Sequence, residues 1–574
     1  MHAVPETPYL GRIIWDVLSE TQYLGRRRKL LGLLGGNLAL GLSGCGCMHP
    51  FAKPEIGEMG RFAAERDEVP FLKPVRSSRT LTQGIFCVDV HAHFFNASDV
   101  TVKGYLEGPV AHKIGGSLGR LVRLLAPLAD GLAEIAPKAS AEYDKLGELS
   151  AQARLQSQEQ FEAVLDGITI EHRTAQSRRF YELLLASPDG RRFLEEYERI
   201  KADALRARPA VAPESQILSI DESSLRRAIE MGEQPRRPSL RDQSIPGGDP
   251  FYAEGILAFV AYMLSYRWTN LRSYKKQFSE RDGALGVDRV LGALVDFDRW
   301  LDCPPRSSHE DQVRLHARLS KLSDGYMLPL ASYNPWTDVE EQGKSLGRLV
   351  QAVNEFKFVG AKIYPANGFR PWNNTAAQDG PGLPSHDAIN GALMCFWDKC
   401  IELDIPVMAH TGQSMGKDDA HDVLAAPEWW GALVDAYAVR GKSPRVNLGH
   451  FGGDTSPPAN DWTKRMAEVM KKAGGDKVFG DLGYWAELQC GVVGDGRCEA
   501  AALRLTSVLD RKAGANERVA DRVMFGSDWL MLSREENWAS YASELFIKLR
   551  SVVPGDVERI FGGNALKCFG QRIR

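Results

Sequence analysis

Residues 85–93 read IFCVDVHAH, an apolar run that leads directly into two histidines. Side chains of an extended segment alternate between its two faces, so His91 and His93 point the same way. Two imidazoles that face one point at the end of an apolar strand can bind one transition metal. Taken alone, the pair also fits a polar end to an ordinary strand. The later strands of the chain decide between these interpretations.

Three later apolar runs end in residues that such a metal site would still need. These runs, 405–409, 445–449 and 522–527, are followed or ended by His410, His450 and Asp528. Each run is short and apolar, as expected of a strand buried on both faces of a parallel sheet. Polar ends in the order HxH, His, His, Asp indicate a metal site rather than unrelated core histidines.

Four more short apolar runs complete a set of eight predicted strands: 290–295, 326–330, 358–361 and 477–479. Helical periodicity fills most of the intervals between them, for example at 341–354 and 386–403. Eight alternating units predict an α/β protein with a closed (β/α)8 barrel of the TIM type. Active residues of such barrels lie at the carboxyl ends of the strands, where all the polar ends above fall.

The interval after the first strand, residues 104–285, shows little strand character. Apolar residues recur at helical spacing over 118–136, 157–165, 178–186, 191–205 and 251–278, and Pro188-Asp189-Gly190 predicts a turn. Residues 209–250 are rich in Pro, Ser, Arg and Gly and predict a long loop. We expect a mainly helical insertion that either decorates the barrel or covers its active face as a lid.

The first 45 residues resemble a secretory signal. Residues 26–29 are basic, residues 30–43 carry no charge, and Leu42-Ser43-Gly44-Cys45 resembles the bacterial lipobox. The arginine run also resembles a twin-arginine signal. We therefore expect an exported protein, periplasmic or held at the membrane by a lipid on Cys45 if the lipobox is processed. In that case residues 46–80 form a tether and residues 81–574 the barrel domain. The alternative is a cytoplasmic protein with a basic leader.

The composition favours a folded enzyme. The 574 residues are 44% hydrophobic and 25% charged, and the formal net charge of −3 gives no electrostatic case for a nucleic-acid partner. We expect a small-molecule substrate instead. Cys490 and Cys498 bracket a glycine-rich loop that would close into a disulfide in an oxidising compartment.

Four motifs, taken together and in order, resemble the amidohydrolase superfamily: VDVHAH at 88–93, AHTG at 409–412, GHFGG at 449–453 and FGSD at 525–528. The resemblance is strongest to the amidohydrolase-related branch that includes aminocarboxymuconate-semialdehyde decarboxylase. The ending IFGGNA at 560–565 also looks like the C-terminal helix of that branch. The leader and the insertion lie outside this resemblance.

The resemblance implies a metal centre with one divalent ion. His91, His93, His410 and Asp528 would be its ligands, and zinc is the expected ion because three imidazoles and a carboxylate suit it. Asp528 would also accept a proton from the activated water. His450 would act as an acid or base, or alternatively as a further metal ligand.

Lys362 ends the fourth predicted strand, and three roles stay open for it. It would face the substrate or water, form a carbamate that bridges two metals as in other superfamily members, or pair with Asp528 or Asp481. Four loop residues are weaker candidates for contacts with an acidic or aromatic substrate: Arg370, Trp372, Tyr484 and Trp485. These four would otherwise pack against the insertion.

We expect a metal-dependent hydrolase in which metal-activated water attacks an amide, ester or lactone carbonyl and His450 assists the leaving group. The first alternative is a metal-dependent non-oxidative decarboxylase, a lyase in which Lys362 or Arg370 holds the substrate carboxylate. The second is a non-catalytic envelope protein that kept the barrel, and the complete ligand set argues against it.

Overall fold

The computed structural model describes residues 68–73, 85–107, 116–206, 253–278, 286–298, 304–378, 382–412, 416, 418–453, 461–489, 497–535 and 538–573. The predicted signal sequence with Cys45, most of the predicted tether and the predicted 209–250 loop lie outside the described residues. Within the ranges above, no helix has both the length and the apolar character needed to cross a membrane.

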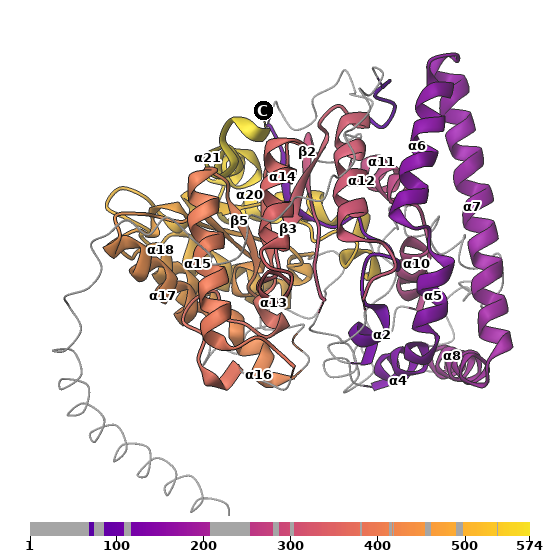
Figure 1. The fold of residues 1–574 in the computed structure, drawn as a ribbon, viewed down its shortest axis with the longest axis horizontal. Helices are drawn as coiled ribbons and strands as arrows, with labels where there is room; N and C mark the ends of the chain where they lie inside the picture. Colours follow the sequence, from indigo (N-terminus) through magenta and orange to yellow (C-terminus); the bar gives the residue numbers. More distant parts are fainter. Residues whose placement is uncertain are drawn as a thin grey trace, which may run out of the picture. The chain divides into compact units, whose positions relative to one another are not determined.

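Eight parallel strands form one sheet in chain order (Figure 1). They are β1 (Val88–Ala92), β2 (Arg289–Ala293), β3 (Met327–Ser332), β4 (Gly360–Ile363), β5 (Val407–His410), β6 (Val446–Gly449), β7 (Val478–Asp481) and β8 (Val523–Met524). Backbone hydrogen bonds join the end of β8 to β1: the amides of Asp528 and His93 donate to the carbonyls of His91 and Trp529. The predicted strands and the TIM-type barrel are confirmed, and all strand carboxyl ends share one rim.

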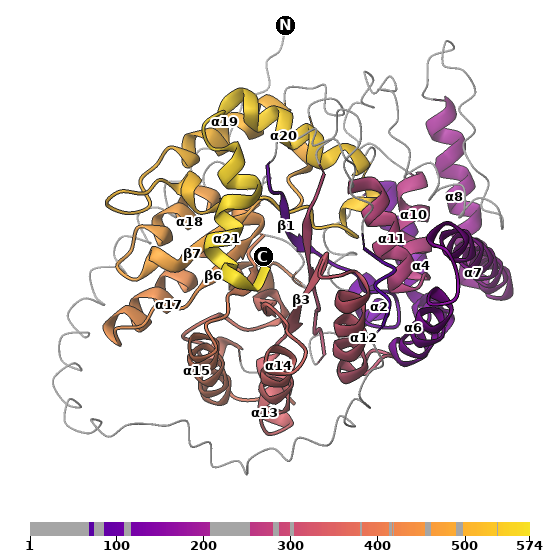
Figure 2. The same cartoon turned by 90° about the horizontal axis from the view of Figure 1, so that it is seen from above.

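Helices cover the outside of the barrel between successive strands (Figure 2). After β2 they are α12 (His309–Leu322), α13 (Pro335–Glu340), α14 (Lys344–Asn354), α15 (His386–Glu402), α16 (Asp419–Asp422), α17 (Pro427–Val439), α18 (Trp462–Met470), α19 (Arg497–Leu509), α20 (Tyr541–Val552) and α21 (Asn564–Phe569). Ser308 and Ser385 begin α12 and α15, because each hydroxyl accepts a hydrogen bond from the amide three residues later. The helices predicted at 341–354 and 386–403 are present as α14 and α15.

Apolar strand residues fill the lower half of the barrel. This interior cluster contains Val88, Val90, Leu291, Ala293, Leu330, Val359, Met408, Phe479 and Met524. Phe569 and its neighbours in and after α21 belong to the same cluster, and the Asn564 amide donates to the carbonyl of Val523 at the start of β8. The C-terminal helix therefore packs on the interior cluster near the amino ends of the strands. The opposite rim is left for polar groups.

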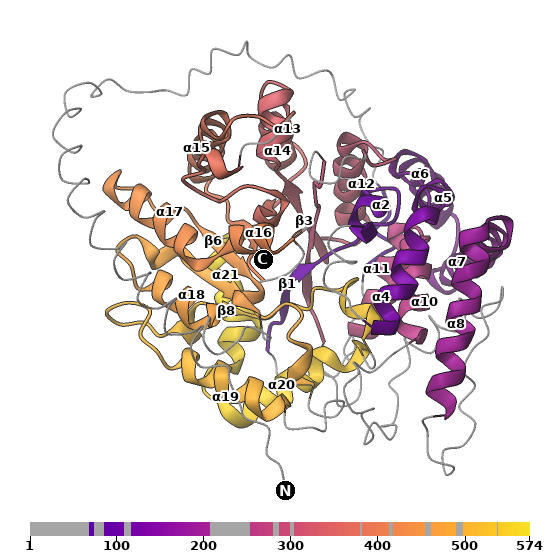
Figure 3. The same ribbon diagram turned by 90° about the horizontal axis from the view of Figure 1, so that it is seen from below.

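The interval between β1 and β2 folds as the predicted helical insertion, beside α12 in Figures 2 and 3. Its helices are α2 (Val102–Tyr105), α4 (Gly116–Leu125), α5 (Ala129–Ile135), α6 (Ala139–Ala153), α7 (Gln158–Ala186), α8 (Pro188–Arg206), α10 (Ala253–Met263) and α11 (Arg267–Phe278). The predicted turn at 188–190 was wrong. Pro188 instead begins α8 directly after α7, because proline fits the first position of a helix.

The uninterrupted helical spacing over 251–278 predicts one helix, but two helices, α10 and α11, form within this range. The carboxylate of Glu142, fully buried in α6, accepts hydrogen bonds from the amides of Arg267 (3.0 Å) and Trp268 (2.8 Å). These amides belong to the first turn of α11, where no backbone acceptor within the helix is available. A carboxylate from another helix therefore starts α11, which the periodicity of the sequence cannot reveal.

The Arg267 side chain is fully buried and holds the insertion to the loop that follows β1. It forms ion pairs with Asp99 and with Glu142 (2.9 Å), and all three side chains are completely inaccessible to solvent. Its guanidinium also donates to the hydroxyl of Ser98 (2.9 Å). A buried ion pair that loses one member leaves an uncompensated charge in a low dielectric.

We expect Arg267→Met to lower the free energy of unfolding by about 3–5 kcal/mol, because two buried carboxylates lose their counter-charge. Arg272 is the matched control on the same helix, since its partners Glu162 and Asp166 are 34% and 69% exposed. Arg272→Met should cost no more than about 1 kcal/mol. The free energies of unfolding of both variants are measured by urea unfolding followed by circular dichroism. Equal losses in the two variants would contradict this account of Arg267.

Candidate metal centre

Buried polar side chains form a layer above the apolar interior cluster. They are His91, His93, Lys362, His410, Asn447, Asp481 and Asp528. Two positions on a strand return a side chain to the same face. His410 therefore lies above Met408 on β5, and Asp481 lies above Phe479 on β7. The layer comes from six strand ends that are far apart in the sequence.

The two histidines of β1 reach this layer through a β-bulge. The pairing of β1 with β2 shifts register between Asp89 and Ala92. Val90 belongs to the interior cluster, yet the next residue, His91, contacts Asp481 of β7, two strands away in the closed sheet. A bulge adds one residue to a strand and redirects the side chains beyond it. The alternation predicted from the sequence therefore holds only in part.

Three side chains present ligand atoms to a common point. The ligand atoms of His91, His93 and Asp528 all lie within 4.8 Å of one another. Nε2 of His91 is 3.6 Å and Nε2 of His93 is 3.4 Å from Oδ1 of Asp528. Nε2 of His91 is also buried without a hydrogen-bond partner. An unsatisfied buried nitrogen is costly unless something else binds it, so this donor set fits a divalent metal ion.

Hydrogen bonds on the far side of each ring fix the tautomer that a ligand needs. Nδ1 of His91 lies 2.9 Å from Oδ1 of Asp481, and Nδ1 of His93 lies 2.9 Å from the carbonyl of Ala293. A carboxylate and a carbonyl can only accept, so both Nδ1 atoms carry the proton. Both Nε2 atoms therefore keep the lone pair that would bind a metal.

Asp481 joins three strand ends at this centre. Besides His91, its carboxylate accepts hydrogen bonds from the amide of Asn447 (2.7 Å) and from the backbone amides of His450 (3.1 Å) and Gly483 (2.9 Å). From the sequence, Asp481 was predicted only as a possible partner of Lys362. The signal was present, because VFGD at 478–481 ends in a polar residue as the other ligand strands do.

Two glycines allow the His91 ring to sit where it does. A Cβ atom on Gly483 would lie 2.7 Å from Nδ1 of His91, and one on Gly526 would lie 2.8 Å from Cβ of His91. Both distances are too short for carbon contacts, so any larger residue would displace the histidine. Because Gly483 and Gly526 carry no side chain, the His91 ring fits against the segments that follow β7 and β8.

His410 and His450 form a second pair next to the group of three. Nδ1 of His450 donates to the carbonyl of Gly483 (2.9 Å), which leaves its Nε2 as an acceptor. Nδ1 of His410 lies 3.0 Å from that Nε2 and must be the donor. Nε2 of His410 is then unprotonated, as a metal ligand requires, although His410 is not a member of the group of three.

Burial sets the protonation of these groups. It lowers the pKa of His91 and His93 well below the ordinary value, and the nearby Lys362 ammonium lowers it further. Burial also lowers the pKa of His450 to about 4, against the opposing effect of Asp481. Neutral imidazoles are the form that binds metals. The structure therefore presents these rings in their ligand form at neutral pH.

Lys362 and Asp528 share the same buried space. Burial lowers the pKa of Lys362 to about 8, and it raises the pKa of Asp528 to about 8 against the attraction of Lys362 and Arg534. Nζ of Lys362 is buried without a hydrogen-bond partner and lies 5.7 Å from the centre of the Tyr364 ring. An unpartnered buried amine is costly, so this site favours a ligand or a modification at Nζ.

The four weaker candidates separate into two pairs. Trp485 is buried and donates from Nε1 to the carbonyl of His450 (2.9 Å), and Tyr484 donates to the carboxylate of Glu535. Arg370 stacks 3.7 Å from the centre of the Trp429 ring, and Trp372 packs against Tyr437. Both of those partners belong to α17. The structure thus brings Trp485 to the metal centre and places Arg370 and Trp372 against an outer helix.

Arg534 was not predicted from the sequence. It follows Asp528 by six residues, and its guanidinium donates to the hydroxyl of Tyr484 (2.7 Å). Its charge acts on Asp528, as described above. Burial raises the pKa of Tyr105, and the Arg534 charge opposes part of that rise. No motif marks Arg534 in the sequence, because its proximity to the centre depends on how the chain folds back after β8.

A second cluster of ionisable side chains lies after β2. Nε2 of His309 is 3.5 Å from the carboxylate of Asp296 and 3.1 Å from that of Asp298. Arg348 also approaches Asp296 (3.3 Å), and the amide of Asn334 donates to it (3.0 Å). A guanidinium already balances the charge here, so we interpret this cluster as a structural ion-pair network.

Comparison with known families identifies one segment of the chain. Residues 333–571 match the family model described as Amidohydrolase. The segment begins directly after β3 and ends beyond α21, so it carries Lys362, His410, His450, Asp481 and Asp528. The histidines of β1 precede it. No curated protein matches the chain.

Solved structures show weak likeness. An uncharacterized TIM-barrel protein from Bordetella bronchiseptica is 17% identical at a TM-score of 0.35, over 53% of this chain and 85% of its own. A probable 2-pyrone-4,6-dicarboxylic acid hydrolase from Acinetobacter baumannii is 12% identical at a TM-score of 0.30, and the match covers 50% of this chain and 84% of its own. A 2,6-dihydroxybenzoate decarboxylase is 15% identical at a TM-score of 0.31, and the match covers 50% of this chain and 84% of its own. The barrel assignment rests on the strand order itself.

We expect Asp481→Asn to weaken divalent-metal binding by about 10- to 100-fold, because His91 loses the carboxylate that fixes its tautomer and orientation. Asp338→Asn is the matched control. Asp338 is also buried, but its carboxylate accepts hydrogen bonds from the backbone amide of Leu346 and the hydroxyl of Tyr333, which do not belong to the centre. Chelator competition measures both affinities. An unchanged affinity in Asp481→Asn would show that Asp481 does not orient His91.

The His309 network should give a pH-dependent stability. Burial disfavours the charged imidazole, but Asp296 and Asp298 outweigh this effect and raise the pKa of His309. The resulting stabilisation is complete below the unfolded pKa of about 6.5 and is lost as pH rises through the higher folded pKa. The difference in Tm between the wild type and His309→Gln should therefore be larger at about pH 6 than at about pH 9. Equal differences at both values would contradict the raised pKa.

Proposed function

We propose, on the premise that residues 333–571 match the Amidohydrolase family model, that the chain belongs to the amidohydrolase-related superfamily and is a metal-dependent hydrolase of small-molecule amides, esters or lactones. The observation that carries this proposal is the arrangement of His91, His93 and Asp528. Their ligand atoms converge within 4.8 Å, and Nε2 of His91 is buried with no hydrogen-bond partner in the described part of the chain. We further propose His410 as the fourth protein ligand through its unprotonated Nε2.

A divalent ion, with zinc as the proposed identity, would act as a Lewis acid and lower the pKa of a water molecule at this centre. The chain supplies the remaining functions. Asp528 is placed to accept a proton, because its carboxylate lies 3.4 Å from Nε2 of His93, where the ligand atoms converge. Lys362 is placed to neutralise negative charge on a substrate, since its amine has no hydrogen-bond partner among the described residues.

The predicted acid or base role of His450 needs a condition that the sequence did not reveal. Its two ring nitrogens are held by the carbonyl of Gly483 and by Nδ1 of His410. For His450 to exchange a proton with a substrate, the His410–His450 hydrogen bond must open. While that bond holds, His450 positions His410 instead.

A second candidate function is non-oxidative decarboxylation, which the buried cations favour. Lys362 and Arg534 both act electrostatically on Asp528, so an anionic substrate group would find two positive charges at the centre. A carboxylic acid substrate would then place its carboxylate against Lys362. Release of carbon dioxide, rather than of an amine or alcohol, separates this reaction from hydrolysis.

We also propose export, which the leader sequence supports. Cys498 is disulfide-bonded, and its expected partner Cys490 lies outside the described residues. Structural disulfides persist in oxidising compartments. Anchoring through a lipid on Cys45 is part of the same proposal.

The test is the metal content of the purified full chain. We expect about one metal ion per chain, lost in His93→Ala together with hydrolysis of a panel of amides, esters and lactones. Removal by a chelator should abolish hydrolysis and zinc should restore it. His316→Asn is the control, because His316 is buried in α12 outside the centre.

Each alternative outcome of this test supports a different conclusion. About two ions per chain would favour a carbamate on Lys362 that bridges both. Carbon dioxide release from aromatic or unsaturated carboxylic acids would favour the decarboxylase. A folded wild type that binds no metal would overturn the proposed function, and a metal-loaded protein inactive on every substrate class would favour the non-catalytic alternative.

A further inference from the structure

We propose that Tyr274, in helix α11 of the insertion, is a positioning residue of the metal centre that acts through Asp89. The inference rests on the proposed metal site but assigns a role to a part of the chain that the family model does not cover. It implies that the insertion supports the ligands of the barrel and does more than decorate it.

Asp89 connects the two segments that carry the converging ligands. Its Oδ1 accepts from the backbone amides of His91 (3.0 Å) and Ser527 (3.0 Å). Its Oδ2 accepts from the hydroxyls of Ser527 and Tyr274, the latter at 2.7 Å. Four donors from β1, the end of β8 and α11 thus satisfy one fully buried carboxylate.

Ser527 transmits this arrangement to Asp528. Its hydroxyl donates to Asp89 and accepts from the backbone amide of Trp529 (3.0 Å). The amides on both sides of Asp528 are therefore tied to the Asp89 group. Asp528 itself adopts φ 54°, a left-handed conformation that is strained for a residue with a side chain. Such a conformation persists only where surrounding bonds impose it.

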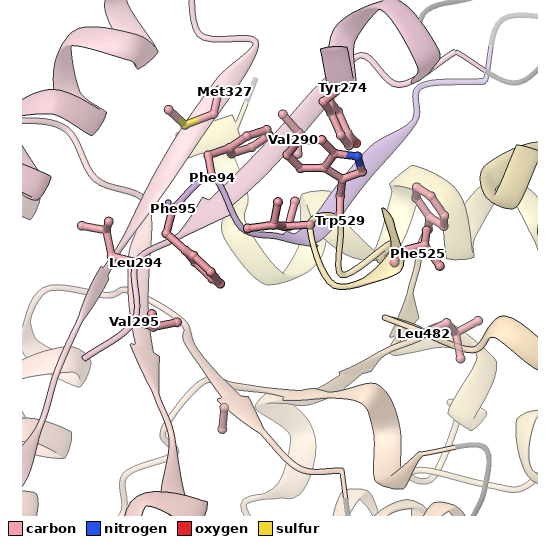
Figure 4. Packing of buried hydrophobic residues seen from close by; sticks show 14 of the residues in the cluster. Phe94, Phe95, Tyr274, Val290, Leu294, Val295, Met327, Leu482, Phe525 and Trp529 are labelled. Carbon is pink, nitrogen blue, oxygen red and sulfur yellow. The ribbon is translucent and has the colours of Figure 1, made fainter. Parts of the chain in front are cut away.

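The ring of Tyr274 is fixed by the residues that follow the ligands. Its centroid lies 5.5 Å from that of Phe94 and 5.6 Å from that of Trp529, both in edge-to-face geometry. Figure 4 shows Tyr274 beside Trp529, close to Phe94. Phe94 directly follows His93, and Trp529 directly follows Asp528. Tyr274 therefore contacts the two ligand segments with its ring and joins them with its hydroxyl.

Helix α11 is held at two points, seven residues apart. Arg267 at its start is buried between Asp99 and Glu142, and Tyr274 lies two turns later against Asp89. Every side chain in this set is buried. This geometry fits a fixed support for the centre.

Tyr274→Phe tests the proposal, because it removes the hydroxyl and keeps the ring that packs. We expect it to weaken Co²⁺ binding by about 10-fold or more, as loss of an outer hydrogen bond typically does at metal sites. We also expect the visible absorption spectrum of the Co²⁺ form to change, since the Asp528 carboxylate is then less well fixed. Both are measured on the full chain, with circular dichroism to confirm folding.

Tyr326→Phe is the matched control. Tyr326 is buried in the same aromatic group, 6.4 Å from Tyr274 between ring centroids, but its hydroxyl has no hydrogen-bond partner within the ranges that the structure describes. It should keep the wild-type Co²⁺ affinity and spectrum. Ser527→Ala removes another donor to the same Oδ2 atom, and we expect it to weaken Co²⁺ binding as well.

The outcomes separate this inference from the proposed function. A wild type that binds Co²⁺ and a folded Tyr274→Phe variant with the same affinity and spectrum would overturn the positioning role while leaving the metal site intact. Equal effects in Tyr274→Phe and Tyr326→Phe would also overturn it, because they would reflect packing alone. A wild type that binds no Co²⁺ would overturn both.

Discussion

The carboxylate of Asp481 holds the candidate metal centre together. A buried carboxylate is costly unless donors surround it, and this one takes its donors from three different strand ends. Because one of those donors is Nδ1 of His91, satisfying the carboxylate also decides which nitrogen of His91 is left for a metal. The requirement to satisfy a buried charge and the requirement to prepare a ligand are met by the same hydrogen bond.

The same physical rule recurs at the other fixed points of the molecule. Asp89 gathers donors from β1, the end of β8 and α11. Glu142 starts α11 and pairs with Arg267, which also binds Asp99. In each case a buried acidic group joins segments that are more than a hundred residues apart. The helical insertion and the barrel are therefore linked by buried charge as well as by aromatic packing.

Some of the strained backbone lies at the rim that carries these groups. Non-glycine residues with positive φ include Asp528 (54°), His450 (64°), Phe451 (44°) and Tyr484 (57°), all at the carboxyl ends of β6, β7 and β8. Left-handed conformations cost free energy in residues with a Cβ atom and cluster where a site needs an exact side-chain direction. The stability of the barrel below offsets this cost.

Several elements of the site could be read from the sequence, and others could not. The polar ends at His91, His93, His410 and Asp528 were recognisable because each interrupts an apolar strand. Asp481 has the same pattern but was predicted only as a possible partner of Lys362. The bulge at Val90–His91, the approach of Arg534 and the hydroxyl of Tyr274 have no local signal, because each depends on partners from distant segments.

The sequence by itself determined the eight strands, the barrel and the helical character of the insertion, since these follow from periodicity and from alternating apolar and polar residues. Only the tertiary structure decided which imidazole nitrogen faces the centre, which residues pack on α17 instead, and where α11 begins. Those choices are made by buried hydrogen bonds between segments that the chain brings together only on folding. The periodicity of apolar residues is a local property of the sequence, whereas the hydrogen bonds that satisfy a buried charge come from distant segments.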